Sequence, residues 1–424
     1  MAEDFGLPSS IEISEVILRG GGKAMDVTDL FFEAALYEEL NNPQLHGKIM
    51  LIDMAGVLTR FGITGQEIIQ FNIKKLEFDE TVSFQVTEVE SLNVAPNGTA
   101  TYVLAIAEEI IVQNSIELVS QAYEGTITSI VESIYNDYLG RTLNFVEESS
   151  GTYRIIIPNW KPFQAINWLM KRAVNANGVP MALTNTWRNG TSILSYDTMF
   201  SRQTMEEFFI NTMPNAEASA DGNAYNYRQI MQKPTNFYTK KHGNALEQIY
   251  KGTYAYTSQQ IDTTRKSSSI LEFTSDYSKD PRLNEFAPVS DKKIYGEKNI
   301  FNQFKAKQQT QYYQGNNFGD NFLSYNSDVN GTVPLRNNYL NILQTYQYDM
   351  TIHGRFDIEV GSIVDITFPN NRIPNEQEPE TDIDNKKSGR HLVAAAAHTF
   401  RIDSYMMNIE CCTDGFGEDA SNVE

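Results

Sequence analysis

Residues 45–71, LHGKIMLIDMAGVLTRFGITGQEIIQF, constrain the fold more than any other segment of this chain. The segment predicts a strand, a turn, a short apolar run, a glycine-marked turn and a second strand. No side chain in it is evidently reactive. We therefore interpret it as a sheet-building unit of the kind from which tubes are made. Its predicted structural turn positions are Gly47, Asp53, Gly56 and Gly65.

The composition indicates a folded, β-rich and acidic protein. The 424 residues allow roughly three domains, and 41% of them are hydrophobic, which argues against general disorder. The 22 Tyr and 23 Phe, with many Val, Ile and Thr, favour strands. A formal net charge of −20 argues against nucleic-acid binding, which requires Lys and Arg side chains that neutralise phosphates. The negative charge is consistent with a solvated acidic surface, or with an acidic surface that does not bind DNA.

Neither a disulfide nor membrane insertion is expected. Cys411 and Cys412 are adjacent and are predicted to be reduced thiols in a strand. The first ten residues lack the basic and apolar regions of a signal peptide. No apolar run approaches the ~20 residues of a membrane span.

The pattern along the chain predicts strands, then an α+β unit, then strands again. Residues 11–110 are mainly β, although residues 25–40 suit either a helix or a strand. Residues 113–200 predict two amphipathic helices, with Pro158 before the second and Pro162 in its first turn, and Gly178 as its stop. A hairpin is expected to turn at Asn189-Gly190.

The second half of the chain is first polar and then β again. Residues 201–348 are rich in Asn, Gln and Tyr, with short strand-like pieces. Residues 349–412 predict strands, interrupted by an acidic loop at 376–384 and followed by an acidic tail. Further predicted turn positions are Gly252, Gly361 and Gly389. His391 and His398, seven residues apart in one predicted strand, are expected on opposite faces.

A search for reactive constellations predicts no catalytic, cofactor or metal site. The five histidines form no metal-binding motif. The acidic loop lacks the glycine and terminal Glu of an EF-hand. Glu132 and Asp137 come nearest to a glycosidase pair, but five residues apart on a helix they diverge. The residues alone predict a large, acidic, β-rich protein without enzymatic activity.

Five segments, taken in order, resemble the central baseplate hub proteins of contractile-tailed bacteriophages. The opening segment resembles the first tube-type domain of that family. The other four are the strand, Pro and helix of 155–169, IYKGTYA at 249–255, IEVGSIV at 358–364, and SGRHLV at 388–393 with His398 and Tyr405 following. The hairpin at 182–187 is less aromatic than is usual in the family, and Ala394–Ala397 are bland for a strand there.

The resemblance implies a β-rich α+β fold with two tube-type β-barrel domains that form a ring in a homotrimer, plus α+β accessory domains. The implied divisions are a first barrel at 1–112, an accessory domain at 113–201, a second tube-type domain with long polar insertions at 202–348, a β region at 349–412 that completes the barrel or accessory domain, and an acidic tail at 413–424.

The resemblance also implies a structural function. The ring would adapt a six-fold tail tube to a three-fold central spike and form part of the DNA exit channel. Implied partners are further copies of the chain, the spike, the tail tube or tube-initiator proteins and other baseplate proteins, with genomic DNA passing without specific binding. No cofactor is implied. The expected location is the tail baseplate of the virion, assembled in the host cytoplasm.

Three alternatives stay open. A spike protein of a type VI secretion system or similar particle usually continues into a β-helical needle, of which this sequence has no repeat pattern. A muralytic hub enzyme would need a carboxylate pair. A carbohydrate-binding β protein could use the tyrosine-rich residues 308–326.

Overall fold

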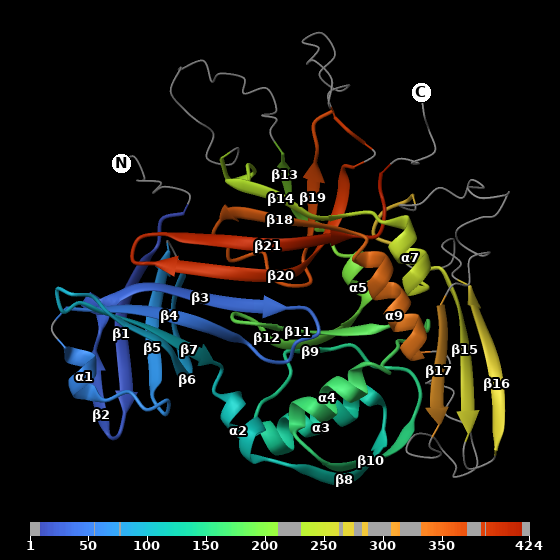
Figure 1. The fold of residues 1–424 in the computed structure, drawn as a ribbon, viewed down its shortest axis with the longest axis horizontal. Coiled ribbons are helices and arrows are strands. Elements are labelled where there is room, and N and C mark those ends of the chain that lie inside the picture. Colours follow the sequence, from blue (N-terminus) through green and yellow to red (C-terminus); the bar gives the residue numbers. More distant parts are fainter. Residues whose placement is uncertain are drawn as a thin grey trace.

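The computed structural model describes residues 9–54, 56–75, 78–210, 230–262, 266–274, 282–286, 307–313, 332–370, 383–385 and 387–417. Within these ranges the fold is α+β and β-rich, as predicted. A 13-stranded sheet dominates it, and three small sheets and several helices surround that sheet (Figure 1). No helix in the described ranges is long and apolar enough to cross a membrane.

The first half of the large sheet comes from the N-terminal part of the chain. Strict alternation builds it, as Ile69, Phe71 and Ile73 are buried while the residues between them are not. Residues 25–40, for which the sequence allowed either a helix or a strand, are mostly strand, with Ala34 and Leu36 facing the core. Its elements are β1 (Glu12–Gly20), β2 (Lys23–Asp26), η1 (Thr28–Leu30), β3 (Phe31–Glu39), β4 (His46–Asp53), α1 (Val57–Phe61), β5 (Ile68–Lys75), β6 (Phe78–Val94) and β7 (Ala100–Ala107).

The second half of the sheet comes mainly from the C-terminal part, and joins the first where the β20 and β3 strands pair antiparallel. Its strands are β13 (Thr204–Phe209), β14 (Asn236–His242), β18 (Tyr346–His353), β19 (Ile363–Thr367), β20 (Gly389–Arg401) and β21 (Tyr405–Thr413). The strand order is β14-β18-β21-β20-β3-β4-β7-β6-β5-β1-β2, with β19 on β20 and β13 on β19. One continuous sheet therefore runs through both halves.

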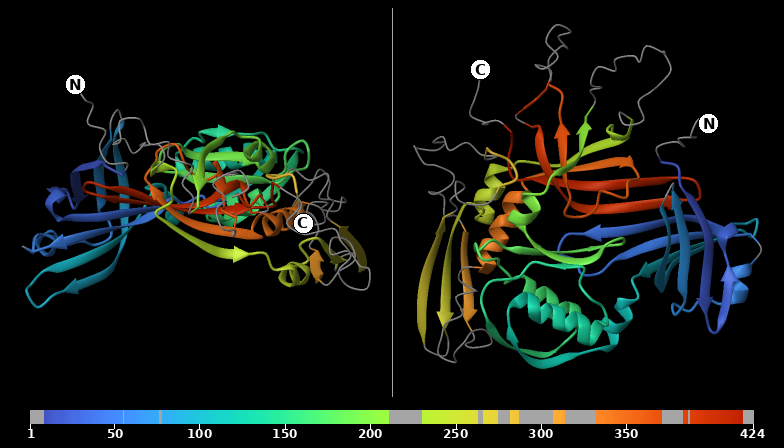
Figure 2. Two further views of the ribbon diagram at one scale, coloured as in Figure 1. Left: turned by 90° about the horizontal axis from the view of Figure 1, so that it is seen from above. Right: turned by 180° about the vertical axis from the view of Figure 1, so that it is seen from behind.

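An α+β unit lies between the halves in sequence and beside the sheet in space (Figure 2). Its α3 and α4 helices bury Ile130, Ile134, Phe163 and Ile166 against each other and the adjoining strands. Its elements are α2 (Ile110–Ile116), β8 (Val119–Gly125), α3 (Ile127–Leu139), β9 (Phe145–Val146), β10 (Tyr153–Trp160), α4 (Pro162–Met170), β11 (Met181–Thr186), β12 (Gly190–Ser195) and α5 (Tyr196–Phe200). The predicted hairpin at Asn189-Gly190 is confirmed by the β11–β12 pairing.

A separate three-stranded sheet forms the side of the molecule opposite the first half (Figure 1). Its central strand pairs antiparallel with one neighbour and parallel with the other. The elements of this region are α7 (Ala245–Lys251), β15 (Ala255–Asp262), β16 (Ser267–Thr274), β17 (Lys307–Tyr313) and α9 (Thr332–Leu343). Residues 202–348 thus contribute to two different sheets, and the domain boundaries predicted from sequence stay a prediction.

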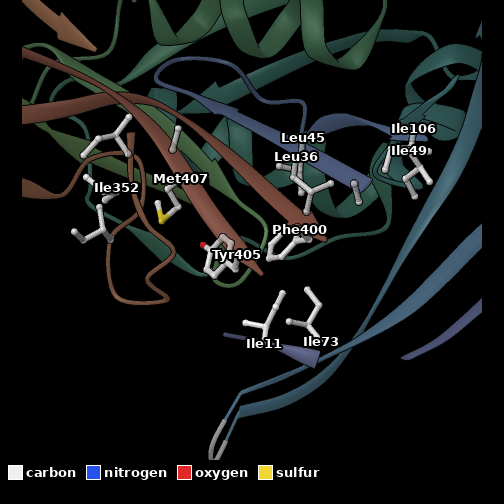
Figure 3. Close-up of a cluster of buried hydrophobic side chains, with 14 of the residues drawn as sticks. Ile11, Leu36, Leu45, Ile49, Ile73, Ile106, Ile352, Phe400, Tyr405 and Met407 are labelled. Carbon is white, nitrogen blue, oxygen red and sulfur yellow. The ribbon is translucent and has the colours of Figure 1, made fainter. Parts of the chain in front are cut away.

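One hydrophobic core spans both halves of the large sheet. Phe400 and Tyr405 from the second half lie near Ile11 and Ile73 from the first (Figure 3). The Phe71 and Phe400 ring centroids are 6.4 Å apart. Burial of such side chains stabilises the fold by roughly 2 kcal/mol each, so the two halves depend on a shared core.

Two local predictions are wrong. His391 and His398 face the same core, because a bulge between Val393 and Ala395 adds a residue and reverses the alternation. The second amphipathic helix ends at Met170 and not near Gly178. Residues 175–179 instead form a turn, in which the Asn175 side chain accepts the N–H groups of residues 177 and 179.

Candidate functional site at the sheet junction

The two halves of the sheet and the α+β unit meet at one point. The tip of the β11–β12 hairpin inserts Trp187 there, with its ring 5.9 Å from Phe356 and 5.8 Å from Phe400 between centroids. Phe78 stacks on Phe356 at 4.1 Å. We call Glu38, Trp187, Phe356, His398 and Tyr405 the junction, because they come from all three parts of the chain.

A buried carboxyl group holds the junction together. Glu38 accepts the backbone N–H of Trp187 at 2.8 Å and that of Val360 at 3.4 Å. His398 Nε2 lies 3.4 Å from Glu38 Oε1, and both side chains are almost fully buried. One residue of β3 therefore fixes the hairpin, the loop after β18 and strand β20 at once.

The hydrogen bonds of the junction place a proton on one ring nitrogen of its histidine. Tyr405 donates its hydroxyl proton to the Arg355 carbonyl at 3.0 Å. Burial raises the pKa of Tyr405, so this proton is kept. The 2.8 Å contact between the same hydroxyl and His398 Nδ1 therefore requires an N–H at Nδ1.

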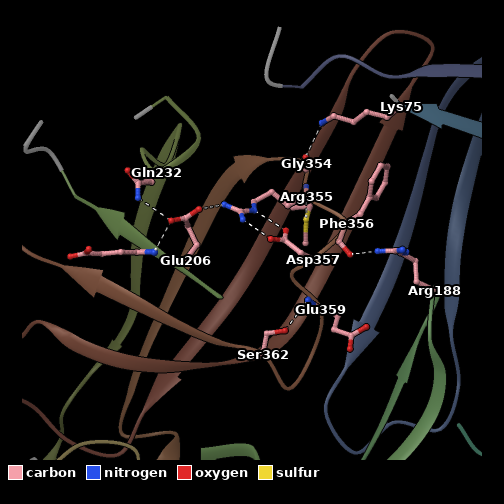
Figure 4. A network of polar contacts seen from close by, with 12 residues as sticks. Lys75, Arg188, Glu206, Gln232, Gly354, Arg355, Phe356, Asp357, Glu359 and Ser362 are labelled. Carbon is pink, nitrogen blue, oxygen red and sulfur yellow. Dashed lines mark hydrogen bonds and ion pairs between the residues drawn. The ribbon is translucent and has the colours of Figure 1, made fainter. Parts of the chain in front are cut away.

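The loop after β18 carries a second polar network (Figure 4). Arg355 forms ion pairs with Glu206 of β13 and with Asp357, the latter also through a 2.8 Å bond from Nε. Burial raises the pKa of Glu206, but the hydrogen bonds from Arg355 and Gln232 and the charge of Arg355 together outweigh this, so the pKa is lowered. The same balance lowers the pKa of Asp357. Lys75 of β5 donates to the Gly354 carbonyl at 3.3 Å, so this loop also contacts the first half.

An acidic trough of about 330 Å³ opens beside the junction. Ala395 and Ala397 on its floor have side chains too small to fill it. The alanine run at 394–397 therefore leaves room for the trough. Burial raises the pKa of Asp349, with Glu410 adding to and Lys240 opposing the effect. Lys240 forms an ion pair with Glu410. The lining residues are Tyr37, Glu38, Glu39, His46, Asp349, Ala395, Ala396, Ala397, Asn408 and Glu410.

The predicted turn positions of residues 45–71 lie in three kinds of local structure: inside a strand, at positive φ angles, and before a helix. Gly47 is inside β4, where an added Cβ would meet the Ala35 carbonyl oxygen at 2.2 Å. Gly56 and Gly65 have positive φ angles of 67° and 85°. Asp53 is buried and accepts the Leu58 N–H at 2.8 Å, at the start of α1.

The remaining predicted positions are spread over the fold and form no common site. Pro158 lies in β10 next to a register shift, and Pro162 is the first residue of α4. Gly252 ends α7 in a left-handed conformation. Gly361 and Gly389 have φ angles of 89° and 151°.

Sequence reasoning did not find the junction. Glu38 lay in the region that suited helix or strand, and its partners are more than a hundred residues away. The sequence feature that could have indicated the junction is Trp187, a large aromatic residue next to the turn of a hairpin that has no other aromatic residue. In the described part of the chain, no group of three His, Cys, Asp or Glu residues could hold a metal ion. The acidic positions 376, 378, 380 and 382 lie outside the described residues.

Comparisons with known proteins place this architecture in a recognisable class. No protein-family model and no curated protein matches the sequence. The tail protein of Neisseria meningitidis MC58 matches with a TM-score of 0.54 and 9% identity, over 96% of this chain and 98% of that chain. The 43 kDa tail protein of prophage MuSo2 from Shewanella oneidensis matches with a TM-score of 0.54 and 10% identity, over 96% and 99%. The chain therefore shares the fold of these two tail proteins, one of them from a prophage, which confirms the resemblance at the level of fold.

Proposed function

We propose that this chain is the structural hub of a contractile phage baseplate. Three copies form a ring that adapts the six-fold tail tube to the three-fold central spike, and the ring forms part of the DNA exit channel. The hub acts in the tail baseplate of the virion and is assembled in the host cytoplasm. Besides its own copies, its partners are the spike, the tube or tube-initiator proteins, and other baseplate proteins.

The observation that carries the proposal is the continuous sheet. Its two halves are joined through β3 and β20, and share one core. Three copies would supply six half-sheets, the number that a six-fold tube requires. The likeness to two tail proteins, one of them from a prophage, across nearly the whole chain supports the same assignment.

The acidic trough supports the channel role. Ala395 and Ala397 on its floor alternate along β20 with Ala396, His398 and Phe400, which are buried. Carboxylates there repel phosphates, and the net charge of −20 has the same sign. A conduit with this face turned inward would let DNA pass without holding it.

An exposed apolar end of the first half is a candidate contact for a neighbouring tail protein. Asp53 and Val94 both pair with Ala100, so Met54 and Val94 lie at the same end of the sheet. Met54 is 78% exposed and Val94 is 66% exposed. Side chains of this kind favour a protein partner over water.

The decisive experiment is a mass measurement of the purified chain in solution, alone and with its candidate spike protein. We expect a species of three times the 48.0 kDa chain mass in at least one condition. A persistent monomer in both would overturn the hub assignment.

A variant tests the apolar end of the first half. V94D should weaken binding of the neighbouring tail protein, whereas I156D, at an equally exposed site on β10, should not.

The proposal includes the absence of enzymatic activity. A peptidoglycan zymogram of the purified chain tests it directly. Clearing that is lost in E132Q or D137N would show a muralytic hub instead. We expect no clearing by the wild-type chain or by either variant.

A further inference from the structure

The side chains of His398 and Glu38 meet across the boundary between the two halves of the large sheet. Glu38 lies on β3 and His398 lies on β20, and these two strands pair antiparallel at that boundary. His398 is 1% exposed and Glu38 is 2% exposed. Because water does not reach either group, the charge of each depends on its neighbours in the protein.

The two ring nitrogens of His398 face different partners. Nδ1 carries a proton, because it donates to the Tyr405 hydroxyl, whose own proton goes to the Arg355 carbonyl. Nε2 has no hydrogen-bond partner in the described part of the chain, and Glu38 Oε1 lies 3.4 Å from it. The charge of the histidine therefore depends on whether Nε2 also carries a proton.

The backbone donors around Glu38 favour its ionised form. Oε1 accepts the Trp187 N–H at 2.8 Å, and Oε2 accepts the Val360 N–H at 3.4 Å. Hydrogen bonds donated to a carboxylate stabilise its negative charge. An unprotonated Nε2 would direct its lone pair at this carboxylate, so two acceptors would face each other with no proton between them.

We propose that His398 is a doubly protonated imidazolium and the buried counter-ion of Glu38, so that one bound proton locks the two half-sheets and the hairpin tip together. In this state each ring N–H faces an acceptor, the Tyr405 hydroxyl at Nδ1 and the carboxylate at Nε2. Both carboxylate oxygens keep their backbone donors.

The other charged groups near the pair do not supply this counter charge. Arg188 and Asp357 both act on the adjacent Tyr405, with opposite sign. The Arg355 guanidinium forms its ion pairs with Glu206 and Asp357. Among the described residues, His398 is the one basic side chain that lies within ion-pair distance of Glu38.

Loss of the proton would weaken three attachments together. Glu38 contacts the hairpin at Trp187, the loop after β18 at Val360 and strand β20 at His398. A buried ion that loses its counter-ion is strongly destabilised. The pair therefore stabilises the junction while the proton is bound, and this contribution is lost once the pH rises far enough to remove the proton.

Nitrogen NMR of the full chain with isotope-labelled histidine, recorded at pH 7, tests the proposal. The chain has five histidines, so few signals overlap. The His398 signals are identified by their loss in H398Q and by through-space contact with the Tyr405 ring. We expect protons on both ring nitrogens of His398. A wild-type spectrum in which Nε2 carries no proton would overturn the proposal.

Two glutamate variants test whether Glu38 holds the proton. E38Q removes the counter charge, so Nε2 should lose its proton at pH 7 while Nδ1 keeps its own. E39Q changes the neighbouring exposed residue of β3 and should leave both nitrogens protonated. An Nε2 that stays protonated in E38Q would contradict the assigned role of Glu38. The wild-type spectrum decides the charge of His398 even if E38Q does not fold.

Discussion

At the scale of single residues, close approach of backbone segments decides where glycine is needed. An added Cβ on Gly47 would meet the Ala35 carbonyl oxygen at 2.2 Å, and one on Gly354 would meet the Tyr405 ring at 2.1 Å. Neither neighbour can move freely, since Ala35 belongs to the β3–β4 ladder and Tyr405 is fully buried. Both glycines therefore fix distances between elements.

We expect G47A to lower the free energy of unfolding by about 3 kcal/mol, because β3 must separate from β4 to admit one methyl group. Urea denaturation of the purified variant measures the loss. The matched control is G417A, where an added Cβ meets only ordinary contacts at 3.5 Å and beyond. Equal stability of the two variants would show that β3 can shift without cost.

Removing a single hydroxyl group tests the junction. Y405F leaves the Arg355 carbonyl and His398 Nδ1 without the partner they share in a buried site. We expect a loss of about 2 kcal/mol in the free energy of unfolding. Y238F changes an exposed tyrosine of β14 and should have no measurable effect. A neutral Y405F would mean that the Arg355 carbonyl finds another donor and the His398 Nδ1–H another acceptor.

At the scale of elements, period-two patterns predicted most strands, since burial on one face alone selects them. The same logic failed where tertiary contacts decide. The β20 bulge that turns both histidines to one core depends on its pairing with β21, which no local pattern encodes. The strand conformation of residues 25–40 could not be predicted locally, because it depends on the pairing of β3 with β20 and β4. The α4 helix ended at Met170, where the apolar stripe alone would have continued it.

The Arg355 ion pairs join the loop after β18 to β13. The pKa values of Glu206 and Asp357 are lowered, so their contribution is present above about pH 4.5 and is lost as the pH falls through the lowered values. We expect R355M to cost about 3 kcal/mol at pH 7, since it leaves Glu206 charged and largely buried.

At pH 3.5 the cost of R355M should be clearly smaller, because protonated carboxyl groups no longer need the guanidinium. Urea denaturation at both pH values gives the comparison. R401M removes the exposed pair with Glu33 and should cost about 0.5 kcal/mol. The same loss for R355M at both pH values would contradict the electrostatic explanation.

At the scale of the whole molecule, the distribution of cores defines what can fold alone. One core contains buried residues from both the N-terminal and the C-terminal strands. A second core draws its buried residues only from the interval between Ile110 and Ile193. The resemblance predicted a first barrel at 1–112, a second tube-type domain at 202–348 and a β region at 349–412, but it could not reveal that the two halves share one core across β3 and β20.

These cores predict different behaviour for two fragments. Residues 109–201 keep a complete core and should fold cooperatively by circular dichroism and urea denaturation, although less stably than in the full chain. The reason for the lower stability is that Ala182, Leu194 and Tyr196 lose their packing against α9. Residues 9–107 should fail to show a cooperative transition, because Phe71 loses Phe400 and the core face of β3 loses its neighbours.

The control for the first fragment is I130D, which places a charge in the α3–α4 core and should abolish its transition. A cooperative transition in residues 9–107 would show that the first half-sheet is an independent domain. In that case the β3–β20 contact would be an interface between domains that can move, and not part of a single rigid sheet. Absence of that transition, together with a folded 109–201 fragment, would establish the two half-sheets as one folding unit into which the α+β unit is inserted.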